Sequence, residues 1–529
     1  MKIKNKNLIV LALAGSVGLS ACGGGGGGGD TPSVPNSDLV YMADASVDGT
    51  NELFSNTRDG SEHRTLTEAS FGAGVVHTYR ISSNGRYIAF MNEGDMLGVS
   101  ELYVDDLDDE LPPLKVSGDL VADSEVFSFK WSPNSDRLAF TVNHETGFRH
   151  ELYIVSADSA QPQLVSADMI PRDNDSFTLD REAYDWSPNG QRLAYIADQD
   201  SAFVAELYSV SENGLDNTKM NGDLEFGGDV VGFKWSPDSQ RVMYRADQDT
   251  NTVYELYSSL ASGLILINLK LNVDPDPMTG GNVSNRYDWS HDSASVAYLG
   301  DLDTIDKREL YTSGFNGGDK VKVSLNAIDN VSTFIWSPVE NRLAYVAVDG
   351  DRSDLYSVLP SGLEHALLSD PMNPDDAIVH AYAWAPDGSR VAIERYISST
   401  DETDLFTVSV DGLTRDPINT QGNVGSFAWS PDSQSIAYRA DQDTAGTNEL
   451  YVASFDGQNI TKVNGPLGFG GDVTTYRWSP DGESLAYRAD LDVDSPHELY
   501  VVDLDGMNLV KVSTSLTTDG NVGNFSWRP

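Results

Sequence analysis

The chain has 529 residues and a formal net charge of −46, from 81 acidic and 35 basic side chains. An electrostatic field of this sign repels nucleic acid and anionic lipid surfaces, so we expect neither as a partner. A single cysteine excludes an intramolecular disulfide framework.

Residues 1–21 have the order of a secretory signal peptide: lysines, an apolar run from Leu8 to Ala14, and small residues before Cys22. The run is too short to span a bilayer permanently. The sequence Leu19-Ser-Ala-Cys22 resembles a bacterial lipoprotein box. This resemblance implies cleavage before Cys22, acylation of that cysteine and, with Gly23 next, sorting to the outer membrane, facing the periplasm or the cell surface. An ordinary signal peptide ending near a cysteine is the alternative.

Seven glycines follow the cysteine and lead into a stretch rich in Pro, Ser and Asn. Such composition forms flexible linkers, with a root-mean-square span of about 20 Å here. We therefore interpret residues 22–37 as a lipidated tether that precedes a folded domain of residues 38–529.

This domain consists of one unit that recurs ten times, at a period of roughly 49 residues, which is typical of propeller blades. Each unit reads as four short strands punctuated by Ser-Pro-Asp and Asp-Gly turns. All nine tryptophans occupy one position of the unit, two residues after a Tyr or Phe, and we expect them to fill the space between blades: Trp131, Trp186, Trp235, Trp289, Trp336, Trp384, Trp429, Trp478 and Trp527.

The two ends of the domain are complementary in phase. Residues 39–43 match the second strand of a unit, and residues 522–527 match the first. Pairing them would complete one blade and remove exposed sheet edges. We therefore predict an all-β fold, a single closed ten-bladed propeller; two smaller propellers are the alternative.

Units such as Trp235-Ser-Pro-Asp-Ser-Gln and Glu255-Leu-Tyr resemble the WD-repeat-like repeats of TolB-type propellers from the bacterial envelope. The resemblance covers residues 38–529 and implies a propeller and an envelope location. TolB itself carries a small α/β domain before its propeller, where this chain has the tether. Membership of the Tol-Pal system is therefore not implied.

Oxygen-bearing residues recur at positions i, i+2 and i+8 in the hairpin between the second and third strands of eight units. Antiparallel pairing places an acid that precedes the first strand, Asp229 or Asp472, beside this hairpin. Hard oxygen ligands without His or Cys suit Ca²⁺ best, so we predict calcium at these corners. Five units carry the full Asp-x-Asp-x5-Glu pattern: Asp198, Asp200 and Glu206; Asp247, Asp249 and Glu255; Asp301, Asp303 and Glu309; Asp441, Asp443 and Glu449; Asp490, Asp492 and Glu498.

A structural interpretation of the same spacing stays open. The first Asp can cap the hairpin through its backbone, while the Glu is solvated or meets an arginine of the adjoining strand. Three units offer such an arginine: Arg245, Arg439 and Arg488.

The repeat does not favour an enzyme. The mature sequence has no Gly-x-Ser-x-Gly elbow, and its eight histidines form no metal-ligand pattern. Carboxylates repeated in most blades favour structure or cation binding over one asymmetric active site, although a polysaccharide lyase or glycosidase remains an alternative.

Topology places the acidic hairpins and the long links between blades on one face of the ring, which is the expected binding surface. The sequence thus predicts a lipid-anchored envelope scaffold that binds another protein and is stabilised by calcium. The alternative is a calcium-dependent adhesin that binds a surface glycan.

Overall fold

The structure is a computed structural model that describes residues 11–12, 39–45, 49–67, 75–93, 98–109, 111–120, 124–143, 150–166, 183–201, 203–263, 269–274, 281–304, 306–326, 328–369, 377–419, 421–468, 470–490, 496–517 and 520–529. Cys22, the tether of residues 22–37, Asp492 and all of the predicted signal peptide except residues 11–12 lie outside these ranges.

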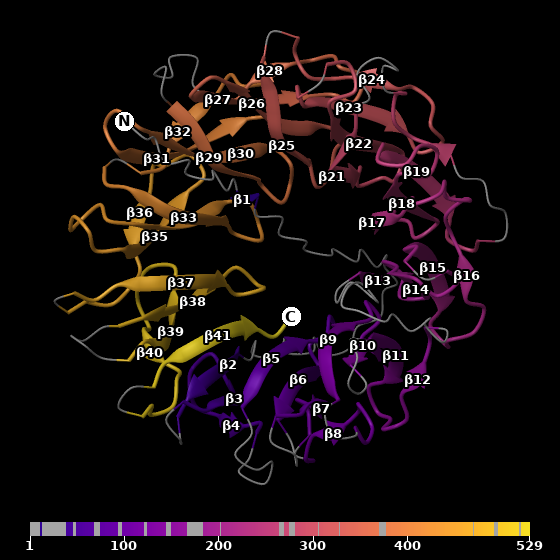
Figure 1. Cartoon of the computed structure of the whole chain (residues 1–529). Helices are drawn as coiled ribbons and strands as arrows, with labels where there is room; N and C mark the ends of the chain where they lie inside the picture. The colour runs from indigo at the N-terminus through magenta and orange to yellow at the C-terminus, as the bar shows by residue number, and fades with distance from the viewer. Residues whose placement is uncertain are drawn as a thin grey trace, which may run out of the picture.

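Ten antiparallel sheets, or blades, are arranged in a ring in the described part of the chain (Figure 1). The first strand of each blade lies nearest the ring axis, and the fourth lies at the periphery. The predicted fold, a single ten-bladed propeller, is confirmed.

The blades follow one another in chain order around the ring. The first five, with their strands from the axis outward, are β41 (Val522–Trp527), β2 (Leu39–Asp44), β3 (Asn51–Asn56) and β4 (His63–Thr65); β5 (Val76–Ile81), β6 (Tyr87–Glu93), β7 (Ser100–Asp106) and β8 (Leu114–Lys115); β9 (Glu125–Trp131), β10 (Arg137–Asn143), β11 (His150–Ser156) and β12 (Gln163–Leu164); β13 (Tyr184–Trp186), β14 (Arg192–Ala197), β15 (Glu206–Ser211) and β16 (Thr218–Lys219); β17 (Val230–Trp235), β18 (Arg241–Ala246), β19 (Glu255–Leu260) and β20 (Leu269–Lys270).

The other five blades have the same order of strands. They are β21 (Val283–Trp289), β22 (Ser295–Gly300), β23 (Glu309–Gly314) and β24 (Val321–Lys322); β25 (Asn330–Trp336), β26 (Leu343–Asp349), β27 (Arg352–Val358) and β28 (Ala366–Leu367); β29 (Ala377–Trp384), β30 (Arg390–Ile397), β31 (Glu402–Ser409) and β32 (Arg415–Pro417); β33 (Val424–Trp429), β34 (Ser435–Ala440), β35 (Glu449–Ser454) and β36 (Ile460–Lys462); β37 (Val473–Trp478), β38 (Ser484–Ala489), β39 (Glu498–Asp503) and β40 (Val510–Lys511).

The ring is closed by pairing the two ends of the domain. Strand β41 lies antiparallel to β2, with Leu39 opposite Trp527 and Tyr41 opposite Phe525. This is the pairing expected from the phase of the repeats. Because β41 completes the blade that β2 begins, β2 is paired on both sides and the two ends of the domain are held in one sheet.

The short strand β1 (Leu11–Ala12) adds to one blade from the side of the ring axis. It pairs in parallel with β29, with Leu11 opposite Ala381 and Ala12 opposite Tyr382.

The described residues contain no helix with the length and apolar character that a membrane span requires.

Tryptophans connect neighbouring blades at the ends of the first strands. The indole Nε1 of Trp235 donates to the carbonyl oxygen of Asp185 in the preceding blade at 3.0 Å, and Trp478 reaches Ala428 in the same way at 3.1 Å. Trp235 is only 8% exposed. The predicted position of the tryptophans between blades is therefore confirmed.

Within each blade, aromatic side chains of the second and third strands cover the sheet. Tyr244 and Tyr257 are stacked with their ring centroids 5.4 Å apart, and both are at least 98% buried. Similar stacked pairs occur in most other blades, for example Tyr298 with Tyr311. Burial of such large aromatic side chains stabilises a sheet whose two faces are covered by neighbouring blades.

We expect Trp235→Ala to lower the free energy of unfolding by about 3 to 5 kcal/mol, because it removes a buried aromatic side chain and an interblade hydrogen bond. Denaturant unfolding of the purified protein measures this change. Val231→Ala, at a side chain that is 45% exposed on the same strand, is the matched control and should cost under about 1 kcal/mol. Equal losses of stability in the two variants would contradict the role of Trp235 in the contact between blades.

Candidate functional site

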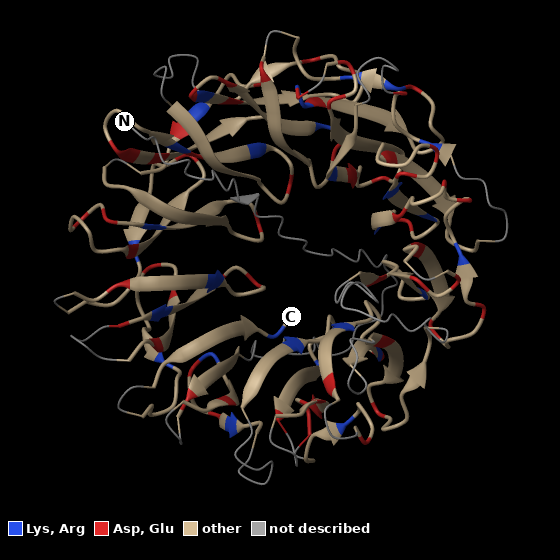
Figure 2. Cartoon of the chain, viewed as in Figure 1, with Lys and Arg blue, Asp and Glu red and all other residues tan. Residues whose placement is uncertain are grey.

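The hairpins between the second and third strands share one face of the ring with the links between blades; we call it the hairpin face. In the blade that begins with β17, the amide of Glu225 in the link donates to the carbonyl of Gln248 in the hairpin at 3.0 Å. Asp and Glu residues are distributed over loops and strand ends all around the ring (Figure 2). The opposite face, which carries the short turns, is called the turn face.

The predicted metal ligands occupy constant places in their blades. The first Asp follows the second strand directly, the middle Asp lies in the hairpin loop, and the Glu is the first residue of the third strand. Asp229 and Asp472 directly precede β17 and β37. Asp492 lies outside the described residues. The spacing seen in the sequence therefore corresponds to constant geometry, which we describe for the blade β33 to β36.

The first Asp of this set caps the hairpin. Asp441 accepts the amide of Asn423 through Oδ1 at 2.6 Å and the amide of Gly446 through Oδ2 at 2.9 Å. Asp247 binds the amides of Asp229 and Thr252 in the same way. The caps on the hairpin are those that the structural interpretation of the sequence described. Each of these carboxylates also joins the hairpin to the residue before its own first strand, which that interpretation did not include.

The Glu and the middle Asp bind a lysine from the fourth strand. Lys462 Nζ lies 2.9 Å from Glu449 Oε1 and 3.0 Å from Asp443 Oδ2, while the hydroxyl of Tyr451 donates to Glu449 Oε2 at 2.9 Å. The hydrogen bond to Glu449 raises the pKa of Lys462. Burial and the same carboxylate raise the pKa of Tyr451. Lysine thus supplies a positive charge where the sequence predicted calcium.

The same ion pair recurs around the ring. Lys322 Nζ lies 2.7 Å from Glu309 Oε1 and 3.4 Å from Asp303 Oδ2. Each pair joins a glutamate at the start of the third strand, in the first position or, for Glu101, the second, to the fourth strand of its blade. The remaining pairs are Lys115 with Glu101, Lys219 with Glu206, Lys270 with Glu255 and Lys511 with Glu498.

Sequence reasoning missed these lysines, although a signal was present. In four of the five full Asp-x-Asp-x5-Glu units, a lysine follows the Glu by 13 residues: Lys219, Lys322, Lys462 and Lys511. Strand pairing explains the spacing, because Lys462 lies directly opposite Tyr451, two residues after Glu449. Glutamate and lysine are then diagonal neighbours, within reach of long side chains.

The acid or amide before the first strand bonds to the preceding blade. Asp229 Oδ1 accepts the amide of Ala205 at 2.7 Å, and Asn423 Oδ1 accepts the amide of Thr403 at 2.7 Å. The backbone of Asp229 does lie beside Asp247, as predicted, but its carboxylate connects two blades. Among the described residues, no group of three His, Cys, Asp or Glu side chains could hold a metal ion together.

The arginines of the second strand bond to the next blade. Arg245 Nε donates to the carbonyl of Val283 at 2.7 Å, and Arg488 Nη1 donates to that of Val522 at 3.1 Å. Arg439 reaches Val473 at 3.2 Å. Burial lowers the pKa of Arg245. The expectation that these arginines meet the glutamates is therefore wrong, because their side chains extend between blades.

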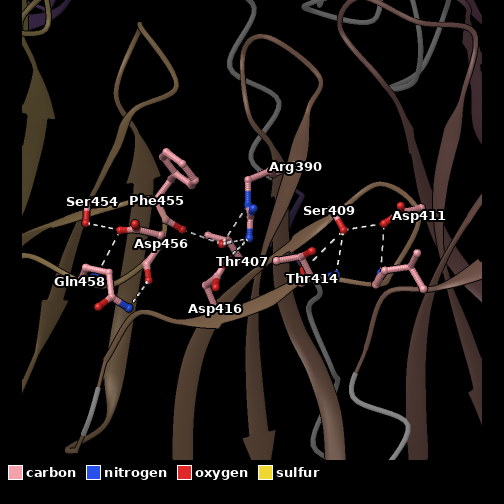
Figure 3. A network of polar contacts seen from close by, with 11 residues as sticks. Arg390, Thr407, Ser409, Asp411, Thr414, Asp416, Ser454, Phe455, Asp456 and Gln458 are labelled. Carbon is pink, nitrogen blue, oxygen red and sulfur yellow. Dashed lines mark hydrogen bonds and ion pairs between the residues drawn. The ribbon is translucent and has the colours of Figure 1, made fainter.

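The turn face has its own interblade contacts (Figure 3). The hydroxyl of Thr407 on β31 donates to the carbonyl of Phe455 in the next blade at 2.7 Å, and Arg390 binds Thr407 and lies over the Phe455 ring, 5.2 Å from its centroid. Asp411 and Asp456 accept hydroxyl groups within their own turns, which holds the pKa of each below its usual range. Polar side chains near these turns thus have structural partners.

We expect Lys462→Met to lower the free energy of unfolding by about 1 to 2 kcal/mol, because Glu449, whose side chain is only 9% exposed, would lose a charged hydrogen-bond partner, although Lys462 itself is 40% exposed. Thermal or denaturant unfolding measures the loss. Lys320→Met removes the same charge at an exposed position and is the matched control, with an expected change under about 0.5 kcal/mol.

Calcium at these corners stays a prediction, and thermal unfolding of the wild type with and without chelator tests it. If lysine supplies the cation, chelator should leave the melting temperature of the wild type unchanged at constant ionic strength. A fall in chelator that millimolar Ca²⁺ reverses, but an equal ionic strength of Na⁺ does not, would support calcium and contradict the lysine-only arrangement.

Comparisons with known proteins gave one family match and several similar solved structures. A family model described as the TolB beta propeller domain matches residues 293–520, while no curated protein matches the chain. Among solved structures, the chain is similar to TolB from Acinetobacter baumannii, with 14% identity over 62% of this chain and 78% of that chain, at a TM-score of 0.28.

Two larger structures also resemble the chain. The tricorn protease has 13% identity over 88% of this chain and 49% of its own, at a TM-score of 0.32. Dipeptidyl peptidase 4 from Porphyromonas gingivalis has 11% identity over 85% of this chain and 60% of its own, at a TM-score of 0.48. The chain therefore spans about half of the first of these proteins. The match over residues 293–520 shows that this part of the ring consists of TolB-like propeller repeats, as the sequence predicted.

Proposed function

We propose that this protein is a lipid-anchored binding scaffold of the bacterial cell envelope, and that its hairpin face docks another protein. A TolB-like propeller is consistent with this role, and such propellers are typical of the envelope. Fold alone does not assign a function, so the argument rests on the surface of the hairpin face.

Exposed aromatic side chains on the hairpin face carry the proposal. Phe226, in the link before β17, is 97% exposed, and Phe203, in the hairpin between β14 and β15, is 64% exposed. The link is held in place, because Asn251 Nδ2 donates to the carbonyl of Phe226 at 3.1 Å and Gly228 donates to Glu225 at 2.8 Å. A large aromatic side chain on an ordered loop is a common anchor of protein interfaces.

The surroundings of this anchor suit a protein partner that carries basic groups. Asp223, Glu225 and Asp249 lie in the same link and in the neighbouring hairpin, and the chain as a whole is strongly acidic. Complementary charge increases the rate of encounter, while the aromatic contact retains the partner. We propose no catalytic activity, because the repeated carboxylates already bind lysines, tyrosines and backbone amides.

We expect Phe226→Ser to abolish capture of the partner from envelope extracts by immobilised protein, without a change in melting temperature. Leu413→Ser, at an 81% exposed side chain on the turn face, is the matched control and should retain the partner. Equal capture by both variants would contradict docking at the hairpin face. A glycan ligand that chelator releases would favour the calcium-dependent adhesin instead.

The lipid anchor is tested separately. We expect Cys22→Ser to move the protein from the membrane fraction to the soluble fraction, because no thiol remains to be acylated. Gly23→Asp keeps the cysteine and should leave the protein in the membrane fraction, shifted from outer to inner membrane by the sorting pattern that the lipoprotein box implies. Unchanged detergent partitioning of Cys22→Ser would contradict acylation.

A further inference from the structure

The first strands, which lie around the ring axis, have the opposite charge balance to the whole chain. Within their described bounds they contain five basic and three acidic residues, against 35 and 81 in the chain. A blue segment is visible on β37, beside the central opening (Figure 2). The basic residues are Arg80, Lys130, Lys234, Arg286 and Arg477, and the acidic ones are Glu125, Asp185 and Asp288.

Two of these acids bind lysines of the preceding blade. Lys130 Nζ lies 3.6 Å from Asp185 Oδ1, and Lys234 Nζ lies 3.1 Å from Asp288 Oδ1. The three arginines, Arg80, Arg286 and Arg477, are exposed, and no carboxylate of the described residues lies within ion-pair distance of them. Arg477 lies over the Phe525 ring, 5.8 Å from its centroid, a contact that leaves its charge without a counterion. An inner surface whose guanidinium groups lack a carboxylate partner among the described residues favours anions, even though the periphery repels them.

The inner surface also offers unpaired strand edges. In nine of the ten sheets, the first strand has no neighbour on its axial side among the described residues. In the remaining sheet, β1 occupies that edge and pairs in parallel with β29. An extended segment of chain therefore fits beside a first strand, where backbone amide and carbonyl groups are available for β-strand addition.

From these two observations we propose that the inner surface of the ring is a second binding site, which takes an extended acidic peptide. Its backbone pairs with the free edge of a first strand, and its carboxylates bind Arg80, Arg286 or Arg477 through charge-assisted hydrogen bonds. This second site goes beyond the proposed function, which uses the hairpin face and Phe226. An experiment can therefore disprove one site without affecting the other.

Fluorescence anisotropy with labelled oligo-glutamate tests this site, using the wild-type protein at physiological ionic strength. We expect the triple variant Arg80→Gln, Arg286→Gln and Arg477→Gln to weaken binding by about tenfold or more, since each guanidinium contributes a charge-assisted contact. The matched control removes three basic residues that lie outside the first strands, Arg86→Gln, Arg308→Gln and Lys320→Gln, and should change the affinity by less than about twofold.

Three further probes test whether the site recognises the charge, the backbone amides or the polymer type of the ligand. Oligo-glutamine of equal length should not bind, and oligo-glutamate with alternate N-methylated amides should bind about tenfold more weakly, because it cannot donate along the strand edge. An equally charged polyuronate should compete poorly. The proposal is overturned if wild-type protein does not bind oligo-glutamate, if both triple variants weaken it equally, or if the polyuronate displaces it at equal concentration.

Discussion

Contacts between blades are the constraint on which the rest of the structure depends. A four-stranded sheet has two faces to bury and has no partner of its own for either, so each blade is stable only between two others. The tryptophan at the end of the first strand stabilises the boundary between two blades in two ways. Trp235 buries its ring, and its Nε1 bonds to Asp185 of the preceding blade. Since Trp527 does the same with Arg477 across the closing blade, the contact extends to the junction of the two ends.

Other interblade contacts occur at three heights along the blade. Asn423 joins the preceding blade near the hairpin face, and Arg488 bonds to the first strand of the next blade. Thr407 bonds to Phe455, in the turn after the third strand of the next blade, near the turn face. Each is a polar side chain that bonds to a backbone group, and burial makes an unpaired partner costly. The spacing of polar residues in the repeat is thus explained by backbone groups that would otherwise lack partners at each boundary.

The fold could be predicted because its determinants are periodic. The spacing along the chain is enough to recognise the nine tryptophans and the aromatic residues before them. It also shows that residues 39–43 and 522–527 match different strands of one unit. The partners of the carboxylates could not be predicted equally well. Glu449 and Lys462 are 13 residues apart, and only the register that places Lys462 opposite Tyr451 brings them together. The direction of a side chain is decided by its nearest neighbours, as Asp229 shows by turning toward Ala205.

Departures from the repeat distinguish surfaces with a role in binding from surfaces that only maintain the ring. A residue that every blade requires is explained by packing, whereas Phe226 is 97% exposed, so packing among the described residues does not explain it. The inner arginines follow the same logic. The residue before the tryptophan is lysine at position 130, aspartate at 185 and alanine at 428, so this position is free to vary while the neighbouring aromatic is constant. Packing does not fix the charge at this position, and Lys130 and Lys234 are explained by their pairing with Asp185 and Asp288. Arg80 and Arg477 occupy the same position without a carboxylate partner among the described residues, and the proposed acidic ligand would give them one.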